Sequence, residues 1–175
     1  MVTELPNISG EWIDKIFNGT AGGFAEKALQ TFYYQYQHNP IYAQYAAAVG
    51  KTPANVSAIT DIPFLPVGFF KTHRVTTTAF EPAVVFESSG TTKTSTSKHY
   101  VTDAKLYENS FASAFEMFYG NAENWCILGL LPSYLERKNS SLIFMMNDLV
   151  QKSRHSLSGF YMNEFEKLRT VLQQL

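Results

Sequence analysis

Residues 83–101 read AVVFESSGTTKTSTSKHYV. The first five residues form a short segment rich in β-branched and apolar side chains, which is typical of a buried strand. Eight of the next ten, residues 88–97, are serine or threonine. Residues 98–101 return to the pattern of a strand. The stretch therefore predicts a buried strand that enters a hydroxyl-rich loop around Gly90 and a second strand that leaves this loop.

The sequence on both sides of this stretch predicts helices and further strands. Upstream, we expect a short helix capped by Ser9, helices over residues 22–37 and 41–49, and an extended segment over residues 61–70. Downstream, we expect a helix capped by Thr102 or Asp103, a strand over 125–131, a helix over 140–152, a strand over 159–162 and a last helix opened by a capping box of Asn163 and Glu166.

These elements predict an α/β fold within one domain or part of a larger one. We expect a helical segment over about residues 1–60, followed over about residues 61–175 by alternating strands and helices with a largely parallel sheet. A parallel sheet with an uncovered edge and uncovered apolar surface favours self-association.

The composition excludes several classes of protein. Hydrophobic residues make up 45% of the 175 and charged residues 17%, so the chain can bury a core. A net charge of -1 argues against nucleic acid as the main partner. The apolar run at 125–131 is too short to span a bilayer, which needs roughly 18 to 20 residues. The single cysteine and an N-terminus without signal-peptide character favour a cytoplasmic location.

The hydroxyl-rich loop has the chemistry of a phosphate site. Glycine lets the backbone approach an oxyanion, while amide N–H groups and hydroxyls supply neutral donors. A solvated surface loop is the alternative interpretation. The loop is not a Walker A motif, because Thr92 stands where that motif needs a glycine before the lysine. The candidate phosphate-binding residues are Ser88, Ser89, Gly90, Thr91, Thr92 and Lys93.

The segment FESSGTT at residues 86–92 resembles the phosphate loop of adenylate-forming enzymes, which include acyl-CoA synthetases and phenylacetate-CoA ligases. Within that group the chain is most similar to the acyl-protein synthetases, the LuxE-type fatty-acid ligases of bacterial luminescence complexes and their relatives. The similarity also rests on DIPFLP at 61–66, FFKTH at 69–73, SKHY at 97–100 and LLPSYLER at 130–137. It extends over most of the chain.

The resemblance implies ATP-dependent activation of a carboxylic or fatty acid as an acyl-adenylate, with Mg²⁺ as the metal. The acyl group then passes to a thiol of coenzyme A or of an acyl-carrier or reductase protein. The loop residues would hold the β- and γ-phosphates, His99 would lie near the nucleotide, and Leu131, Pro132 and Tyr134 would contribute to an acyl pocket. Lys93 replaces the family's second glycine, and it either alters the turn or reaches a phosphate.

Members of this family continue well beyond the position of Leu175, so the resemblance implies the N-terminal half of such an enzyme. It places the magnesium-binding acid and the acylated cysteine outside these residues, with no metal ligand within the chain and no turnover by this part alone. The alternative is a non-catalytic α/β module that binds a phosphorylated ligand or a partner protein, in which Lys93 marks the loss of catalysis.

The remaining chemically active residues have structural interpretations beside the functional ones. Cys126 lies in an apolar run and is expected to pack in the core rather than act as a nucleophile. His99 suits either a nucleotide contact or a structural role.

Residues 71–74 include Lys71, His73 and Arg74, a basic group that either meets an anion or forms a solvated turn. Lys152, Arg154 and His155 match the dipole at a helix C-terminus.

Overall fold

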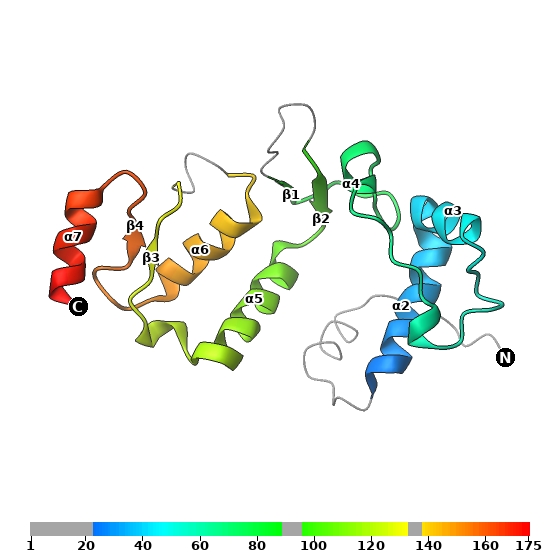
Figure 1. Cartoon of the computed structure of the whole chain (residues 1–175), viewed down its shortest axis with the longest axis horizontal. Helices are drawn as coiled ribbons and strands as arrows, with labels where there is room; N and C mark the ends of the chain where they lie inside the picture. Colours follow the sequence, from blue (N-terminus) through cyan, green and yellow to red (C-terminus); the bar gives the residue numbers. More distant parts are fainter. Residues whose placement is uncertain (1–22, 89–95, 133–137) are drawn as a thin grey trace. The chain divides into compact units, whose positions relative to one another are not determined.

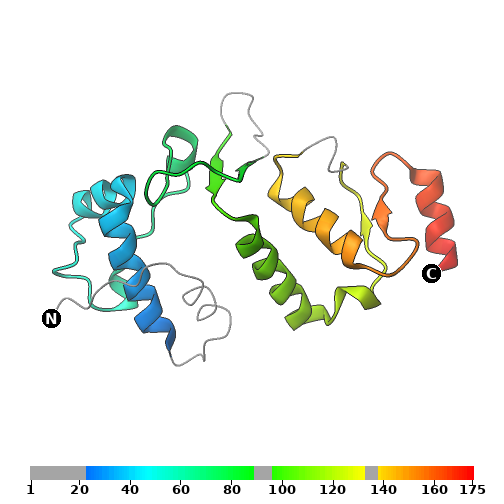
Figure 2. The same cartoon turned by 180° about the vertical axis from the view of Figure 1, so that it is seen from behind.

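The computed structural model describes residues 23–88, 96–132 and 138–175 (Figures 1 and 2). The chain divides into two compact units. The first comprises residues 1–81 and 92–100, and the second comprises residues 82–91 and 101–175. The helix predicted at Ser9 lies outside the described residues.

The first unit is built on two consecutive helices, α2 (Phe24–His38) and α3 (Pro40–Ala48), which confirms both helices predicted there. Asn39 separates them. Its side-chain oxygen accepts a hydrogen bond from the Tyr42 N–H at 3.2 Å and caps α3. Pro40 occupies the first turn of α3, where a missing N–H costs nothing. Gly50, at a φ of +72°, follows the end of α3 as predicted.

The core of the first unit is a cluster of Phe32, Tyr42 and Val56. The Tyr33 hydroxyl donates to the Val56 carbonyl at 2.9 Å, and the Tyr42 hydroxyl donates to the Pro63 carbonyl at 2.7 Å. Burial, with a smaller contribution from Tyr45, raises the pKa of Tyr42 to about 12. Tyr42 therefore remains a neutral donor that fixes the following segment onto the helices.

That following segment contains two short helices, η2 (Ile59–Asp61) and α4 (Phe69–Thr72). The extended segment predicted over residues 61–70 is thus wrong at both ends: Asp61 belongs to η2, and residues 67–68 form a turn before Phe69 and Phe70 of α4. The prolines disfavour helix only up to residue 66, and the chain turns into a helix as soon as they have passed.

The second unit combines helices with short strands. Its elements are β1 (Val84–Glu87), α5 (Ala104–Tyr119), η3 (Ala122–Asn124), β3 (Leu128–Gly129), α6 (Ser141–Lys152), β4 (Gly159–Phe160) and α7 (Phe165–Gln174). The strand β2 (Lys98–Val101) pairs with β1. β3 and β4 pair in parallel, with Leu128 opposite Gly159 and Gly129 opposite Phe160, and α6 connects them.

The described residues therefore mix helices and strands as an α/β class predicts, but the sheet is smaller than expected. Their strands form two separate two-stranded sheets, of which β3–β4 is parallel. The strand predicted over 125–131 shortens to Leu128–Gly129. Before it, the Trp125 backbone N–H donates to the Ala122 carbonyl and the Ile127 N–H to the Ser158 hydroxyl, so neither N–H donates to a neighbouring strand.

Helix ends in the second unit follow the sequence at three places and depart from it at one. Asp103, not Thr102, caps α5, Gly120 ends it at a φ of +77°, and Ser140 caps α6. The capping box of Asn163 and Glu166 is wrong. The Glu164 N–H donates to the Tyr161 carbonyl in a turn, which leaves Asn163 outside a helix whose N-cap is Glu164.

Two phenylalanines of α2 provide a test of the first core. Phe32 is 2% exposed and Phe24, on the same helix, is 67% exposed. We expect Phe32→Ala to lower the free energy of unfolding by about 3–5 kcal/mol, because it removes a buried aromatic ring and leaves a cavity. Phe24→Ala makes the same change of side chain at an exposed position and should change stability by less than about 1 kcal/mol. Urea unfolding followed by circular dichroism measures both, and equal effects would contradict this core.

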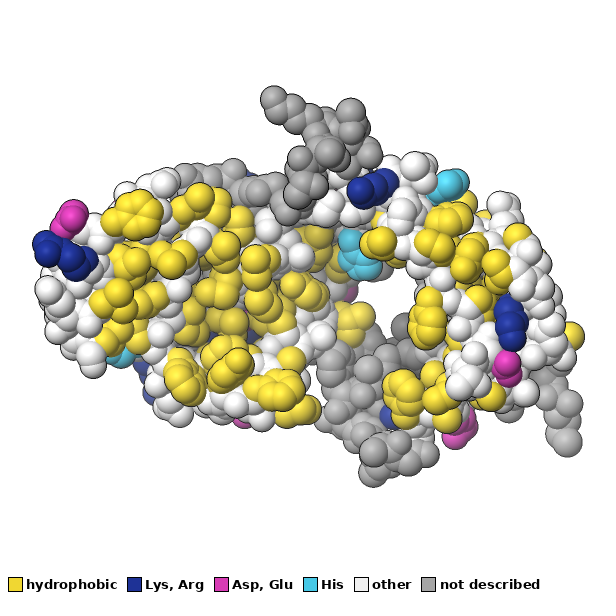
Figure 3. All heavy atoms as spheres, in the orientation of Figure 1, with side chains coloured by type: hydrophobic (Ala, Val, Ile, Leu, Met, Phe, Trp, Pro, Cys, Tyr) yellow, Lys and Arg dark blue, Asp and Glu magenta, His cyan; other side chains and the backbone are white. Residues whose placement is uncertain are grey.

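Large apolar side chains remain exposed in the second unit. Met117, Phe118 and Tyr119 at the end of α5 are 78%, 77% and 60% exposed, and Phe165 on α7 is 70% exposed. Figure 3 shows hydrophobic side chains over much of the visible face of this unit. Exposed apolar patches larger than a few hundred Å² are uncommon on monomers.

We expect the 175-residue chain to self-associate, because contact between such patches removes apolar surface from water. Its average mass in sedimentation equilibrium should rise with concentration. Phe118→Lys should reduce this rise, whereas Ser113→Lys, which adds the same charge at an exposed position of α5, should not. A chain that stays monomeric at every concentration would refute the expectation.

Candidate functional site

The hydroxyl-rich loop joins two paired strands. β1 ends at Glu87 and β2 begins at Lys98, as the sequence predicts. The Ala83 N–H donates to the Val101 carbonyl at 2.9 Å, so the start of β1 lies beside the end of β2. Of the candidate phosphate-binding residues, Ser88 is described and exposed. The other five lie outside the described residues: Ser89, Gly90, Thr91, Thr92 and Lys93.

The strand that leads into the loop is anchored in the core of the second unit. Phe86 is 5% exposed, and its ring lies edge-on to the rings of Tyr107 and Phe144 at centroid distances of 5.2 and 5.5 Å. The Glu87 N–H donates to the Asn139 carbonyl at 2.7 Å. β1 therefore has a fixed position up to the residue before Ser88.

In the first unit, the structure brings together two blocks that are distant in sequence, the α4 region and β2. The Phe70 and His99 rings are 6.4 Å apart, and the Arg74 guanidinium lies over the Tyr100 ring at 4.7 Å. These contacts place residues 69–74 against the strand that leaves the hydroxyl-rich loop. The basic side chains of these two segments, Lys71, His73, Arg74 and His99, are all exposed.

Arg74 is held in place by two contacts. Besides the contact with Tyr100, its Nη2 donates to the Phe80 carbonyl at 2.9 Å. His73 stacks on Phe69 at 5.2 Å and shares a 2.8 Å hydrogen bond with the Thr72 hydroxyl. Within the described ranges, neither Lys71 nor Arg74 has a carboxylate oxygen within 4.0 Å of its charged nitrogens.

The candidate acyl-pocket residues follow β3. Leu131 and Pro132 are half-buried, and Tyr134 lies outside the described residues. Just before them, Gly129 is buried against Phe160, and a Cβ added there would lie 3.1 Å from a ring carbon. The neighbouring Leu130 is 59% exposed. The described part of this segment thus presents apolar side chains at the end of a short strand.

The other residues singled out from the sequence have structural roles here. Cys126 is half-buried and unpaired, just before the buried Ile127. Lys152 pairs with Asp148 at 2.6 Å and lies over the Phe111 ring, so it supports α6 and the core beside it. Arg154 pairs with Glu123 at 3.1 Å.

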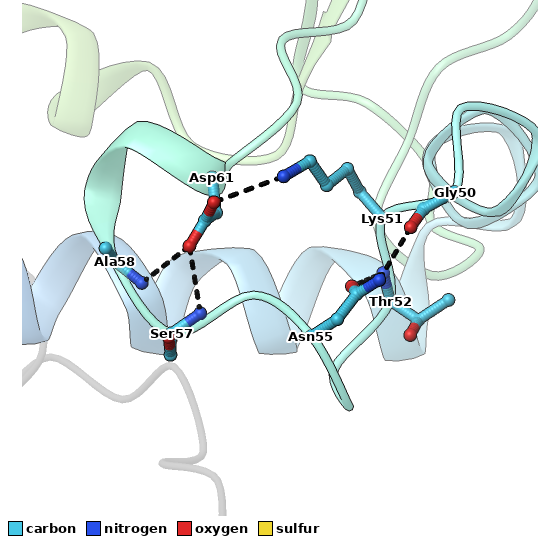
Figure 4. A network of polar contacts seen from close by, with 7 residues as sticks. All are labelled: Gly50, Lys51, Thr52, Asn55, Ser57, Ala58 and Asp61. Atoms are coloured by element: carbon cyan, nitrogen blue, oxygen red, sulfur yellow. Dashed lines mark hydrogen bonds and ion pairs between the residues drawn. The ribbon is translucent and has the colours of Figure 1, made fainter.

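The sequence did not predict the hydrogen-bond network around Asp61. Asp61 entered the sequence analysis only as part of the DIPFLP motif. The Asp61 carboxylate accepts hydrogen bonds from the Lys51 ammonium at 3.1 Å and from the Ala58 and Ser57 N–H groups at 3.2 and 3.5 Å (Figure 4). Asn55 closes the neighbouring turn by accepting from the Thr52 N–H and donating to the Gly50 carbonyl. The motif residue Asp61 therefore fixes the loop between α3 and η2.

Comparison with known proteins gives no match: the chain matches no protein-family model, no curated protein and no solved structure. Among the residues that the structure describes, no three histidine, cysteine, aspartate or glutamate side chains gather in a way that would hold a metal ion. In the same part of the chain, every helix is too short or too polar to span a membrane.

The Asp61 network predicts a pH-dependent contribution to stability. Its hydrogen bonds with Lys51, Ala58 and Ser57 lower the pKa of the Asp61 carboxyl below its ordinary value of 3.8. A lowered pKa in the folded state means that the stabilisation is complete well above pH 3.8 and is lost as the pH falls through the lowered value. We therefore expect Asp61→Asn to reduce stability at pH 7, and its difference from the unmodified chain to shrink in acid.

Urea unfolding at a series of pH values measures this difference. Glu116→Gln is the matched control, because Glu116 is exposed on α5 and its carboxylate forms no ion pair within the described residues. A stability difference for Asp61→Asn that is the same at pH 7 and at pH 3 would show that the carboxylate charge does not contribute.

Proposed function

We propose that this chain binds the phosphate groups of ATP and takes part in the activation of a carboxylic or fatty acid, as in acyl-protein synthetases. The observation that carries the proposal is the position of the loop. The Ser/Thr-rich residues follow a strand whose last residues are fixed in a core, and they lead into a second strand paired with the first. This arrangement suits a set of preorganised donors for phosphate oxygens.

The proposed reaction has two steps. A carboxylate oxygen of the acid attacks the α-phosphorus of ATP, the bond to the β-phosphate oxygen breaks, and pyrophosphate leaves. A thiolate of coenzyme A or of an acyl-carrier or reductase protein then attacks the acyl carbonyl, and AMP leaves. Charge builds on the leaving pyrophosphate in the first step. Donors fixed in advance around the β- and γ-phosphates stabilise that charge.

The loop residues would share this task. Amide N–H groups and the hydroxyls of Ser88, Ser89, Thr91 and Thr92 would donate to phosphate oxygens, and Gly90 would allow the backbone to approach. Mg²⁺ would neutralise charge on the phosphates of the bound nucleotide. In this proposal the acid that would bind the ion lies outside these residues, as the resemblance implies.

The sequence blocks around the loop support the same assignment. The FFKTH block and the SKHY block are brought together by the contact of Phe70 with His99, so the motif residues upstream of the loop lie beside the strand that follows it. Leu131 and Pro132 supply apolar surface after β3 and are proposed, with Tyr134, to contact the acyl chain. The proposed location of the protein is the cytoplasm.

One observation favours a second function. Lys93 stands where the family loop has a glycine, and a side chain at that position restricts the turn. The second candidate is therefore a non-catalytic module that binds a phosphorylated ligand or a partner protein through the same loop. The two functions share phosphate binding and differ in the transfer of the nucleotidyl group.

Exchange of labelled pyrophosphate into ATP separates these functions. With the complete gene product that contains these residues, we expect exchange that depends on an added acid, tested with a panel of fatty and aromatic acids. Gly90→Val should lower kcat/KM for exchange by about 100-fold or more, because a lost preorganised donor contact costs about 3 kcal/mol in the transition state.

Gly23→Val is the control, because it makes the same change at a glycine whose φ of -102° any residue adopts. Full activity of Gly90→Val would show that the loop does not hold the phosphates. Phosphate binding without exchange for any acid would favour the non-catalytic module.

A further inference from the structure

We propose that residues 74–80 form a strained strap that opens without unfolding of the first unit and that loosens the pairing of β1 with β2 when it opens. The two ends of the strap are joined by a side chain, because Nη2 of Arg74 donates to the Phe80 carbonyl at 2.9 Å. The strap lies between α4 and β1 in the chain. It acts on the strands beside the hydroxyl-rich loop whichever ligand that loop binds.

The backbone of Thr78, in the middle of the strap, is strained. Its φ is +70°, the one positive value among the described residues other than glycine. A β-branched residue is particularly unfavourable in this left-handed region, because its side chain crowds the backbone. The Thr78 side chain is exposed, and among the described residues it forms no contact that would offset this cost. The strain therefore raises the free energy of the closed strap.

Two hydrogen bonds hold the middle of the strap against the end of α2. The Thr78 N–H donates to the His38 carbonyl at 3.0 Å, and the Thr77 hydroxyl donates to Gln35 Oε1 at 3.1 Å. His38 is the last residue of α2, so its carbonyl has no acceptor role within that helix. The closed strap thus satisfies a carbonyl at the helix end and accepts the strain at Thr78 in return.

The strap has little else to keep it closed. None of residues 74–80 is buried, so opening exposes less apolar surface than unfolding of the core around Phe32 and Val56. Strain of this kind is comparable in size with the net contribution of one or two hydrogen bonds. The closed strap is therefore only slightly more stable than the open one, and it opens while the core stays folded.

Arg74 connects the strap to the strands on both sides of the loop. Its guanidinium lies over the Tyr100 ring of β2 at 4.7 Å and is bonded to Phe80, four residues before β1 begins. Opening removes the bond to Phe80, so the segment that leads into β1 is no longer held to a residue that contacts β2. The first interstrand bond to weaken is expected at Ala83, whose N–H donates to the Val101 carbonyl.

Native-state hydrogen exchange of the 175-residue chain, followed by NMR, measures the opening directly. We expect the Thr78 amide to be protected about tenfold less, or weaker still, than the Val56 amide, which donates to the Thr52 carbonyl in the core. Low urea concentrations should accelerate exchange at Val56 and not at Thr78, because a local opening exposes little surface. Equal protection with equal urea dependence would mean that the strap opens only with the whole unit, and would overturn the inference.

Two glycine substitutions at neighbouring exposed residues test the strain. Thr78→Gly places at a positive φ the residue that adopts it freely, and we expect exchange at residue 78 to slow by about tenfold. Ala79→Gly is the matched control, because φ there is not positive and glycine only adds freedom to the open strap. Exchange in Thr78→Gly that is no slower than in Ala79→Gly would show that Thr78 stores no strain, and would overturn the inference.

Thr77→Val tests the hold on the strap. It keeps the shape of the side chain and removes the hydroxyl, while Gln35 Oε1 still accepts from the Asn39 side chain, so no buried acceptor loses its last partner. We expect exchange at Thr78 to rise about fivefold, the effect of one hydrogen bond of typical net strength. Unchanged exchange at Val56 verifies that the first unit remains folded.

The Ala83 amide reports the link to the strands. In Thr77→Val its exchange should rise together with that of Thr78, because the open strap no longer restrains the start of β1. Faster exchange at Thr78 with unchanged exchange at Ala83 would separate the strap from the strands and overturn the proposed coupling. Unchanged exchange at both amides would show that the bond from Thr77 does not hold the strap.

Discussion

The buried amide of Asn39 is the interaction on which the first unit depends. Its side chain is 5% exposed, accepts from the Tyr42 N–H and donates to Gln35 Oε1 at 3.0 Å, while the same Gln35 oxygen accepts from the Thr77 hydroxyl at 3.1 Å. One buried amide thus ends α2, begins α3 and ties the segment before β1 to both. A buried polar group without partners would cost about 1–3 kcal/mol, so this network is specific as well as stabilising.

The positions of the first-unit residues near the candidate site depend on that junction. The turn at Asn39 sets α3 beside α2, which allows the Tyr42 hydroxyl to reach the Pro63 carbonyl. From there the chain continues to α4 and the residues that follow it, where Phe70 and Arg74 contact β2. On the other side of the loop, Phe86 fixes β1 in the core of the second unit. Packing that is remote from the loop therefore fixes the residues on each side of it.

The sequence predicted those helices and strands whose positions depend on neighbouring residues. The apolar spacing and local caps located α2, α3, α5 and α6, and the strand signals around the loop located β1 and β2. The predictions failed where a hydrogen bond to a distant or competing group determines the end of an element. The turn at Tyr161 moves the start of α7, and the hydrogen bond of the Ile127 N–H with Ser158 shortens β3. The Lys51–Asp61 pair and the Phe70–His99 contact join segments whose proximity no spacing reveals. The phosphate loop itself remains a prediction, since residues 89–95 lie outside the described ranges.

The order in which the two units use the chain has a consequence for synthesis. The chain enters the second unit at residue 82, returns to the first at 92 and enters the second again at 101. Domains commonly fold in order as they emerge from the ribosome. Here the first unit cannot acquire its last strand until residue 100 has emerged, and by then β1 has been made without α5 and α6, against which Phe86 packs. The nascent chain therefore exposes the apolar side chains of β1 until Phe144 has been made, 57 residues after Glu87.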